Sequence, residues 1–100
     1  MVALIRTDKT RTEIEPNNGN KFTLEELQEY VGGHIECPRL PDGSVMILNE
    51  EGKIRGLPIN YSATQIWIDR FGVSSDVILG DVVLMNKEEW KAWNVLDEEE

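Results

Sequence analysis

The segment from residue 49 to residue 64 holds the side chains of this chain that are best suited to binding chemistry. Lys53 and Arg55 supply positive charge close to a helix that we expect to begin near Asn60 or Ser62. The first N–H groups of a helix point outward without partners, so they can bind a phosphate or a carboxylate. The candidate ligand-binding residues are therefore Asn49, Lys53, Arg55, Asn60, Ser62 and Thr64.

The same residue types also suit a purely architectural role. Asn, Ser and Thr cap helices and order loops through side-chain bonds to the backbone. Gly52 would serve a turn that needs a positive φ angle. The pattern leaves both interpretations open.

Catalytic and metal-binding patterns are weak. His34 and Cys37 are the single histidine and the single cysteine of the chain. Residues three apart in a strand point to opposite faces, so this pair is not expected to form a nucleophile and its base. The sequence has no CxxC, HxxxH or EF-hand spacing for a metal ion. We therefore expect a protein that is not an enzyme and that uses no metal or cofactor.

Composition narrows the class of partner. The chain has 100 residues, of which 40% are hydrophobic, and carries a formal net charge of −9. We expect a single domain over residues 1–96, followed by an acidic tail at 97–100. Direct nucleic-acid binding is not expected, because the phosphate backbone is bound by lysine and arginine. The acid serves solubility or forms a surface for a basic partner protein.

Targeting signals are not evident. No apolar run approaches the roughly 18 residues of a membrane span, and the apolar start of the chain meets charge at Arg6. One cysteine cannot form an internal disulfide. We expect a cytoplasmic protein that does not bind membranes.

Local patterns predict the elements that must position these residues. We expect strands over 2–7 and 10–15, and a helix capped by Thr23 and ended at Gly32. The turn at 41–43 predicts a hairpin of strands 34–40 and 44–48, with Pro38 at an edge or a bulge.

The second half of the chain continues this alternation. Residues 54–57 are expected to pair briefly, and Ser62 with Gln65 suggests a capped helix that ends at Gly72. A buried strand over 76–85, interrupted near Gly80, and a short helix from Asn86 follow. The predicted fold is α+β, with two main helices and a short C-terminal helix on one face of a mainly antiparallel or mixed sheet.

Two tryptophans form a candidate interface. Trp90 and Trp93 are three apart on the last predicted helix, so they share one face. An uncovered face of this kind favours a partner, whereas core packing is the alternative. A free hairpin edge near residues 44–48 leaves a homodimer open.

Five motifs follow one another along the chain: residues 22–36, Asn49-Glu-Glu-Gly-Lys53, 57–60, Ala63-Thr64 and 76–83. Together they resemble domain-of-unknown-function family 3846, from about residue 2 to residue 85. The resemblance assigns no catalytic residue. It implies an accessory protein of a phage, plasmid or other mobile element, made in a bacterial cell.

Two functions follow as hypotheses. The first is a non-enzymatic binding module, such as a counter-defence inhibitor, that uses an acidic surface against a host protein. The second is a small-ligand binder that holds an anionic metabolite or nucleotide at the 49–64 segment and the N-terminus of the second helix.

Overall fold

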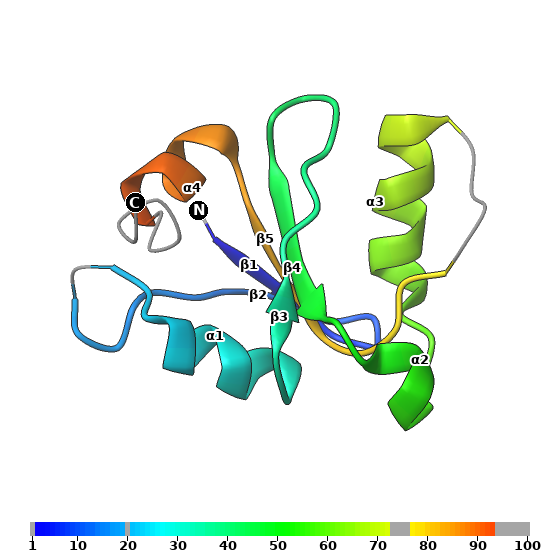
Figure 1. The fold of residues 1–100 in the computed structure, drawn as a ribbon. Helices are drawn as coiled ribbons and strands as arrows, with labels where there is room; N and C mark the ends of the chain where they lie inside the picture. Colours follow the sequence, from blue (N-terminus) through cyan, green and yellow to red (C-terminus); the bar gives the residue numbers. More distant parts are fainter. Residues whose placement is uncertain (1, 20, 73–76, 94–100) are drawn as a thin grey trace.

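The computed structural model describes residues 2–19, 21–72 and 77–93. Within them lies one antiparallel sheet of strand order β2-β1-β5-β4-β3, flanked by helices (Figure 1). The strands are β1 (Ala3–Ile5), β2 (Arg11–Glu13), β3 (Ile35–Glu36), β4 (Val45–Asn49) and β5 (Val82–Met85). The helices are α1 (Leu24–Val31), α2 (Gly52–Arg55), α3 (Tyr61–Phe71) and α4 (Lys87–Trp93). The predicted α+β class and the mainly antiparallel sheet are confirmed.

The sheet is covered on both faces. Every residue of β4 is buried, and alternate side chains enter two separate cores. Val45 and Ile47 pack in the core on the α1 and α4 side, whereas Met46 and Leu48 pack in the core that includes Ala63 of α3. In Figure 1, α1 and α4 lie on one side of the sheet and α3 on the other. The expectation that the helices share one face is therefore wrong.

The two ends predicted for the first helix and the start predicted for the last helix are confirmed. The Thr23 hydroxyl accepts a hydrogen bond from the Glu26 N–H at 3.2 Å, and Gly32 ends α1 with a φ angle of +82°. At the start of α4, the side chains of Asn86 and Glu89 each accept from the other's N–H at 2.8 Å. This reciprocal arrangement satisfies two N–H groups that the helix itself leaves unpaired.

Two predictions in the middle of the chain are wrong. Residues 54–57 do not pair as a strand, because β4 already has β3 and β5 as neighbours and offers them no edge. They contribute instead to α2, a single turn that Gly56 ends with a φ angle of +65°. Of the two starts expected for the second helix, Asn60 is confirmed, since its Oδ1 accepts from the Ala63 N–H at 2.9 Å, and the capping box of Ser62 with Gln65 is wrong.

The strand predicted over 76–85 is shorter than expected. Ile59 and Leu79 form an isolated antiparallel bridge, Gly80 turns the chain with a φ angle of +80°, and β5 begins at Val82. Asp76, together with the tail at 97–100, lies outside the described residues. In the described part of the chain, every helix is too short or too polar to cross a bilayer.

Candidate functional site

A hollow of about 630 Å³ opens on the α3 side of the sheet, beside the β3 edge. Its apolar lining comes chiefly from Leu48, Trp67, Ile78 and Leu79, which belong to β4, α3 and the segment before β5. A volume of this size is within the range of sites that hold small molecules or side chains of a partner. We call this feature the α3-side hollow.

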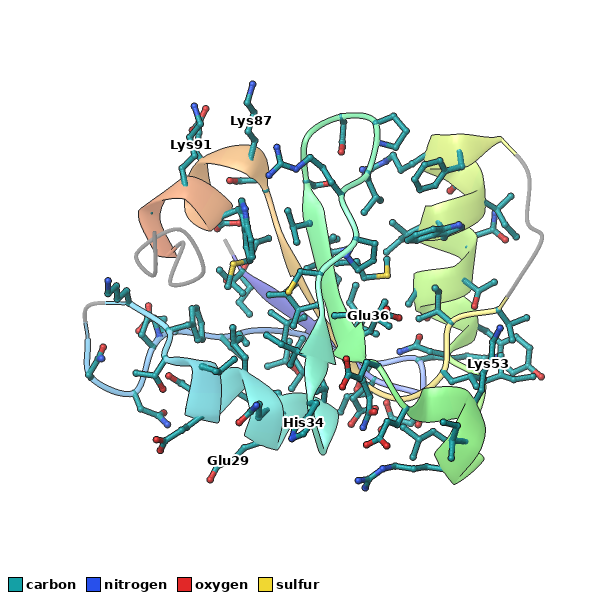
Figure 2. The ribbon with its side chains drawn as sticks, in the orientation of Figure 1. Glu29, His34, Glu36, Lys53, Lys87 and Lys91 are labelled. Carbon is teal, nitrogen blue, oxygen red and sulfur yellow. The ribbon has the colours of Figure 1, made fainter. Side chains whose placement is uncertain are left out.

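Charged and apolar side chains share the rim of the α3-side hollow. Glu36 lines it from β3 and Lys53 from α2 (Figure 2). Glu50, which follows β4, also lines it. Ile54 of α2 is 84% exposed and Val77 is 41% exposed, although both are apolar. The rim is therefore amphipathic, with acidic groups on the strand side.

The single turn of α2 sets the position of Lys53 and Ile54. Gly52 is buried at its start, and a Cβ atom there would lie 3.3 Å from the Cβ of Leu79. The Arg55 N–H bonds the Glu51 carbonyl at 2.9 Å, which closes the turn. A helical turn packed this closely presents its outer residues to the solvent above the hollow.

Asn49 is a buried link between elements as well as a lining residue. Its side chain is 3% exposed. The Nδ2 donates to the Val31 carbonyl at 3.1 Å, and the Oδ1 accepts from the Glu51 N–H at 2.8 Å. Asn49 thus joins the end of α1 to the entry of α2.

Asn60 is fully buried, and each of its polar hydrogens and its oxygen has a partner. The Nδ2 donates to the Ile5 carbonyl at 2.9 Å and to the Gly80 carbonyl at 2.8 Å, while the Oδ1 caps α3. The Thr64 hydroxyl, also buried, accepts from the Ile78 N–H at 2.9 Å. These side chains hold the start of α3 against β1 and the segment before β5.

The structure does not bring the six candidate ligand-binding residues together. Asn49 and Lys53 line the α3-side hollow. The lining does not include Arg55, Asn60, Ser62 or Thr64. The Arg55 guanidinium lies 3.4 Å from the Glu51 carboxylate in an exposed pair.

Glu36, Ile54 and Trp67 line the α3-side hollow but were not among the candidate binding residues. Ile54 is the one of the three that the sequence could have indicated, because it is a large apolar residue within the polar stretch 50–56. Glu36 and Trp67 carry no local signal, since only the fold places β3 and α3 beside α2.

The two candidate interface residues differ in what the structure describes. Trp90 is 7% exposed and packs in the core on the α1 side, as the core alternative expects. The side chain of Trp93 lies outside the described part of the structure, although its backbone completes α4. The interface on α4 stays a prediction.

His34 and Cys37 have separate surroundings. The exposed His34 Nδ1 lies 3.5 Å from the Glu50 carboxylate. Burial, with a smaller contribution from the Glu36 charge, raises the pKa of Cys37 to about 11, so its thiol is protonated at neutral pH. A protonated thiol is a poor nucleophile. Among the described residues, no cluster of His, Cys, Asp and Glu is suited to a metal ion.

Comparison with known proteins places the chain in a family. No curated protein and no solved structure matches it significantly. The sequence model of the family described as "Domain of unknown function (DUF3846)" matches residues 1–99. Because that match spans nearly the whole chain, the protein belongs to the DUF3846 family.

Proposed function

We propose that this protein is a non-enzymatic binding module whose α3-side hollow and rim recognise a partner protein. It acts as an accessory protein of a bacterial phage or other mobile element and occupies a host protein, such as a defence component. The observation that carries the proposal is the combination of an apolar hollow, an exposed isoleucine beside it and acidic groups on the same rim.

Ile54 is the main apolar contact of the proposed surface. At 84% exposure, its side chain is left almost entirely in water. Burying a side chain of this size contributes about 1.5–3 kcal/mol. Trp67 in the adjoining hollow adds an aromatic residue of the kind that dominates binding energy at protein interfaces.

Charge supports a basic protein partner. The chain carries a net charge of −9, and Glu36 and Glu50 lie on the rim itself. A negative surface steers a basic partner during encounter and disfavours acidic competitors. Binding that depends on this charge weakens as salt rises, because exposed charges are screened.

A small anionic ligand has less support at this surface. Lys53 contributes positive charge to the α3-side hollow, but Glu36 and Glu50 on the same rim would repel a phosphate or carboxylate. At the α3 N-terminus, the Asn60 side chain already accepts the Ala63 N–H. The protein partner is therefore the function that these contacts favour.

The proposal is tested by affinity capture from a bacterial lysate with matched variants. Ile54→Asp introduces a charge on the rim at a position that is 84% exposed, so folding is preserved. Tyr61→Asp makes the same kind of change at a 61% exposed position that does not line the hollow. We expect the wild type and Tyr61→Asp to recover the same partner, and Ile54→Asp to lose it.

The salt dependence of capture tests the role of charge, and two outcomes would contradict the proposal. Recovery should fall when the lysate is adjusted from low to high salt. The proposal is contradicted if Ile54→Asp recovers the same proteins as the wild type, or if no variant recovers a partner that calorimetry confirms as a direct binder.

A further inference from the structure

We infer that the partner binds as an added β-strand along the open edge of β3. A lysine or arginine of this strand lies beside Glu36, and the strand's other side chains on that face lie over the α3-side hollow. This inference rests on the proposed binding function and specifies the form of the partner. The edge, the faces of β3 and the local charge each support it.

The hydrogen-bond register shows which backbone groups of the edge point outward. The His34 carbonyl accepts from the Glu50 N–H at 3.0 Å, the Pro38 carbonyl accepts from the Met46 N–H at 3.1 Å, and the Leu40 N–H donates to the Ser44 carbonyl at 2.8 Å. Even-numbered residues of this segment therefore face β4. Ladder bonds alternate along an antiparallel strand, so odd-numbered residues face away from it.

The outward residues are Ile35, Cys37 and Arg39. β3 is the last strand of the sheet, and the described part of the chain supplies no backbone partner to Ile35 or Cys37. Their N–H and C=O groups form a row that a further strand can pair with. Such rows are the sites at which extended peptides join a sheet.

Pro38 does not block this edge. A proline protects an edge strand when the position without an N–H faces outward. Here Pro38 lies at an inward position, because its carbonyl bonds Met46 of β4. The proline removes a bond within the sheet and leaves the outer row of backbone groups intact.

The two faces of β3 define what an added strand would meet. Glu36 and Pro38 line the α3-side hollow, whereas Ile35 and Cys37 pack against the core on the α1 side. A strand beside β3 lies about 4.8 Å away, and its side chains alternate between the same two faces. One set of its side chains therefore lies next to Glu36 at the mouth of the hollow.

Glu36 sets the charge of the preferred strand. Its carboxylate is exposed and has no ion-pair partner among the described residues. Opposite charges on neighbouring strands stabilise pairing, whereas like charges directly opposite destabilise it. A lysine or arginine at the position beside Glu36 is thus favoured.

A second copy of this chain is a poorer occupant of the edge. In antiparallel self-pairing centred on Glu36, two glutamates would lie directly opposite each other. Each copy also carries a net charge of −9, which adds repulsion. These charges favour a basic segment of another protein.

The test uses a short peptide of alternating lysine and valine and two backbone-methylated forms. One form carries N-methyl groups on its valines and the other on its lysines, so each removes one row of N–H donors. Calorimetric titration of the full chain should show that one form binds within about twofold of the parent peptide and the other at least about tenfold more weakly. Equal affinities of the two forms would overturn strand addition.

A pair of charge reversals tests the position. Glu29 extends from α1 away from Glu36 (Figure 2), so Glu29→Lys alters the net charge as Glu36→Lys does, at another site. We expect Glu36→Lys to weaken the parent peptide at least about tenfold and Glu29→Lys less than about threefold. Equal losses would show that general attraction, and not the edge, binds the peptide.

The outcomes separate this inference from the proposed function. If the methylated forms bind alike while Ile54→Asp still abolishes partner capture, the binding module stands and strand addition fails. If sedimentation shows a dimer that the parent peptide dissociates, the edge belongs to a second copy, and the assignment to a basic partner is overturned.

Discussion

The side-chain amide of Asn60 donates a hydrogen bond of 2.9 Å to the backbone carbonyl of Ile5, a residue 55 positions earlier. The same nitrogen bonds the Gly80 carbonyl at 2.8 Å, and the oxygen caps α3. One side chain therefore connects the end of β1, the turn before β5 and the first turn of α3. The stability of the segment 49–64 depends on this junction.

We expect Asn60→Ala to lower the free energy of unfolding by about 3 kcal/mol. The substitution removes a helix cap, worth about 1 kcal/mol, and the side-chain donor of two buried carbonyls, of which Ile5 keeps its ladder pairing with Val82. Ser62→Ala serves as the control, since Ser62 does not cap the helix, and should change stability by less than about 0.5 kcal/mol. Urea titration measures both, and equal losses would contradict the assignment of the cap to Asn60.

Asn49→Ala should loosen the α3-side hollow before it unfolds the protein. The substitution leaves the Val31 carbonyl and the Glu51 N–H unpaired, which lowers stability by about 2 kcal/mol. We expect amide exchange to rise most at Glu51 and across α2, as measured by hydrogen exchange. Glu50→Gln, on the exposed neighbour, is the control and should leave exchange across α2 unchanged. A uniform rise over the whole chain would argue against a local role.

Gly33→Ala tests how closely the side-chain amide of Asn49 packs against residue 33. A Cβ atom at residue 33 would lie 3.0 Å from the Asn49 Nδ2, which its own bonds hold in place. We expect a loss of about 1–2 kcal/mol from this overpacking. The double variant with Asn49→Ala should lose less than the sum of the two single losses, because the contact is then absent. Strict additivity would show that residue 33 acts independently of Asn49.

Cys37 should make stability fall at high pH. Burial raises the pKa of the folded thiol to about 11 from the ordinary value of 9.0. The unfolded chain therefore loses the proton first, so this contribution is complete below pH 9 and is lost as pH rises toward 11. Thermal unfolding of the wild type and Cys37→Ala across this range measures it. An equal pH slope in both proteins would contradict it.

Asp42 should make stability fall at low pH. Hydrogen bonds from the Ser44 hydroxyl, then the Ser44 backbone N–H, and the nearby Arg70 charge lower the pKa of Asp42 below 3.8. Its contribution is present above that ordinary value and is lost as pH falls through the lower folded value. Asp42→Asn should therefore show a smaller acid-induced loss of thermal stability than the wild type, with Asp69→Asn as the control. Identical acid profiles for wild type and Asp42→Asn would refute this linkage.

The helix boundaries that depend on local chemistry were predictable from the sequence. Thr23 caps α1, Asn86 and Glu89 cap α4 reciprocally, and glycines end α1 and α3. Each of these signals lies within a few residues of the structure that it sets. Short-range bonds of this kind are the part of a fold that single-sequence reasoning recovers best.

The choice between Asn60 and Ser62 as the cap of α3 was not predictable, because long-range contacts decide it. Ser62 and Asn60 are both good caps by type. Asn60 has a further amide nitrogen that satisfies carbonyls at Ile5 and Gly80, and no local pattern reveals those partners. The buried run from Val45 to Leu48, by contrast, was a readable sign that helices cover both faces of the sheet.

The α3-side hollow was only half predictable. The notable composition of residues 49–64 pointed to the region, and Asn49 and Lys53 do line it. Glu36 and Trp67 reach the same hollow from β3 and α3, which only the folded arrangement brings beside α2. Sites assembled from distant segments carry no spacing that a sequence can display.

The pairing of β1 with β5 has a consequence for synthesis on the ribosome. Ala3 to Ile5 lie beside Val82 to Leu84, so the centre of the sheet joins residues near opposite ends of the described chain. The apolar strand at residues 3–5 must wait until residues 82–84 have left the ribosome before it finds this neighbour. Formation of the sheet centre is therefore expected at the slower rate that contacts distant in sequence impose.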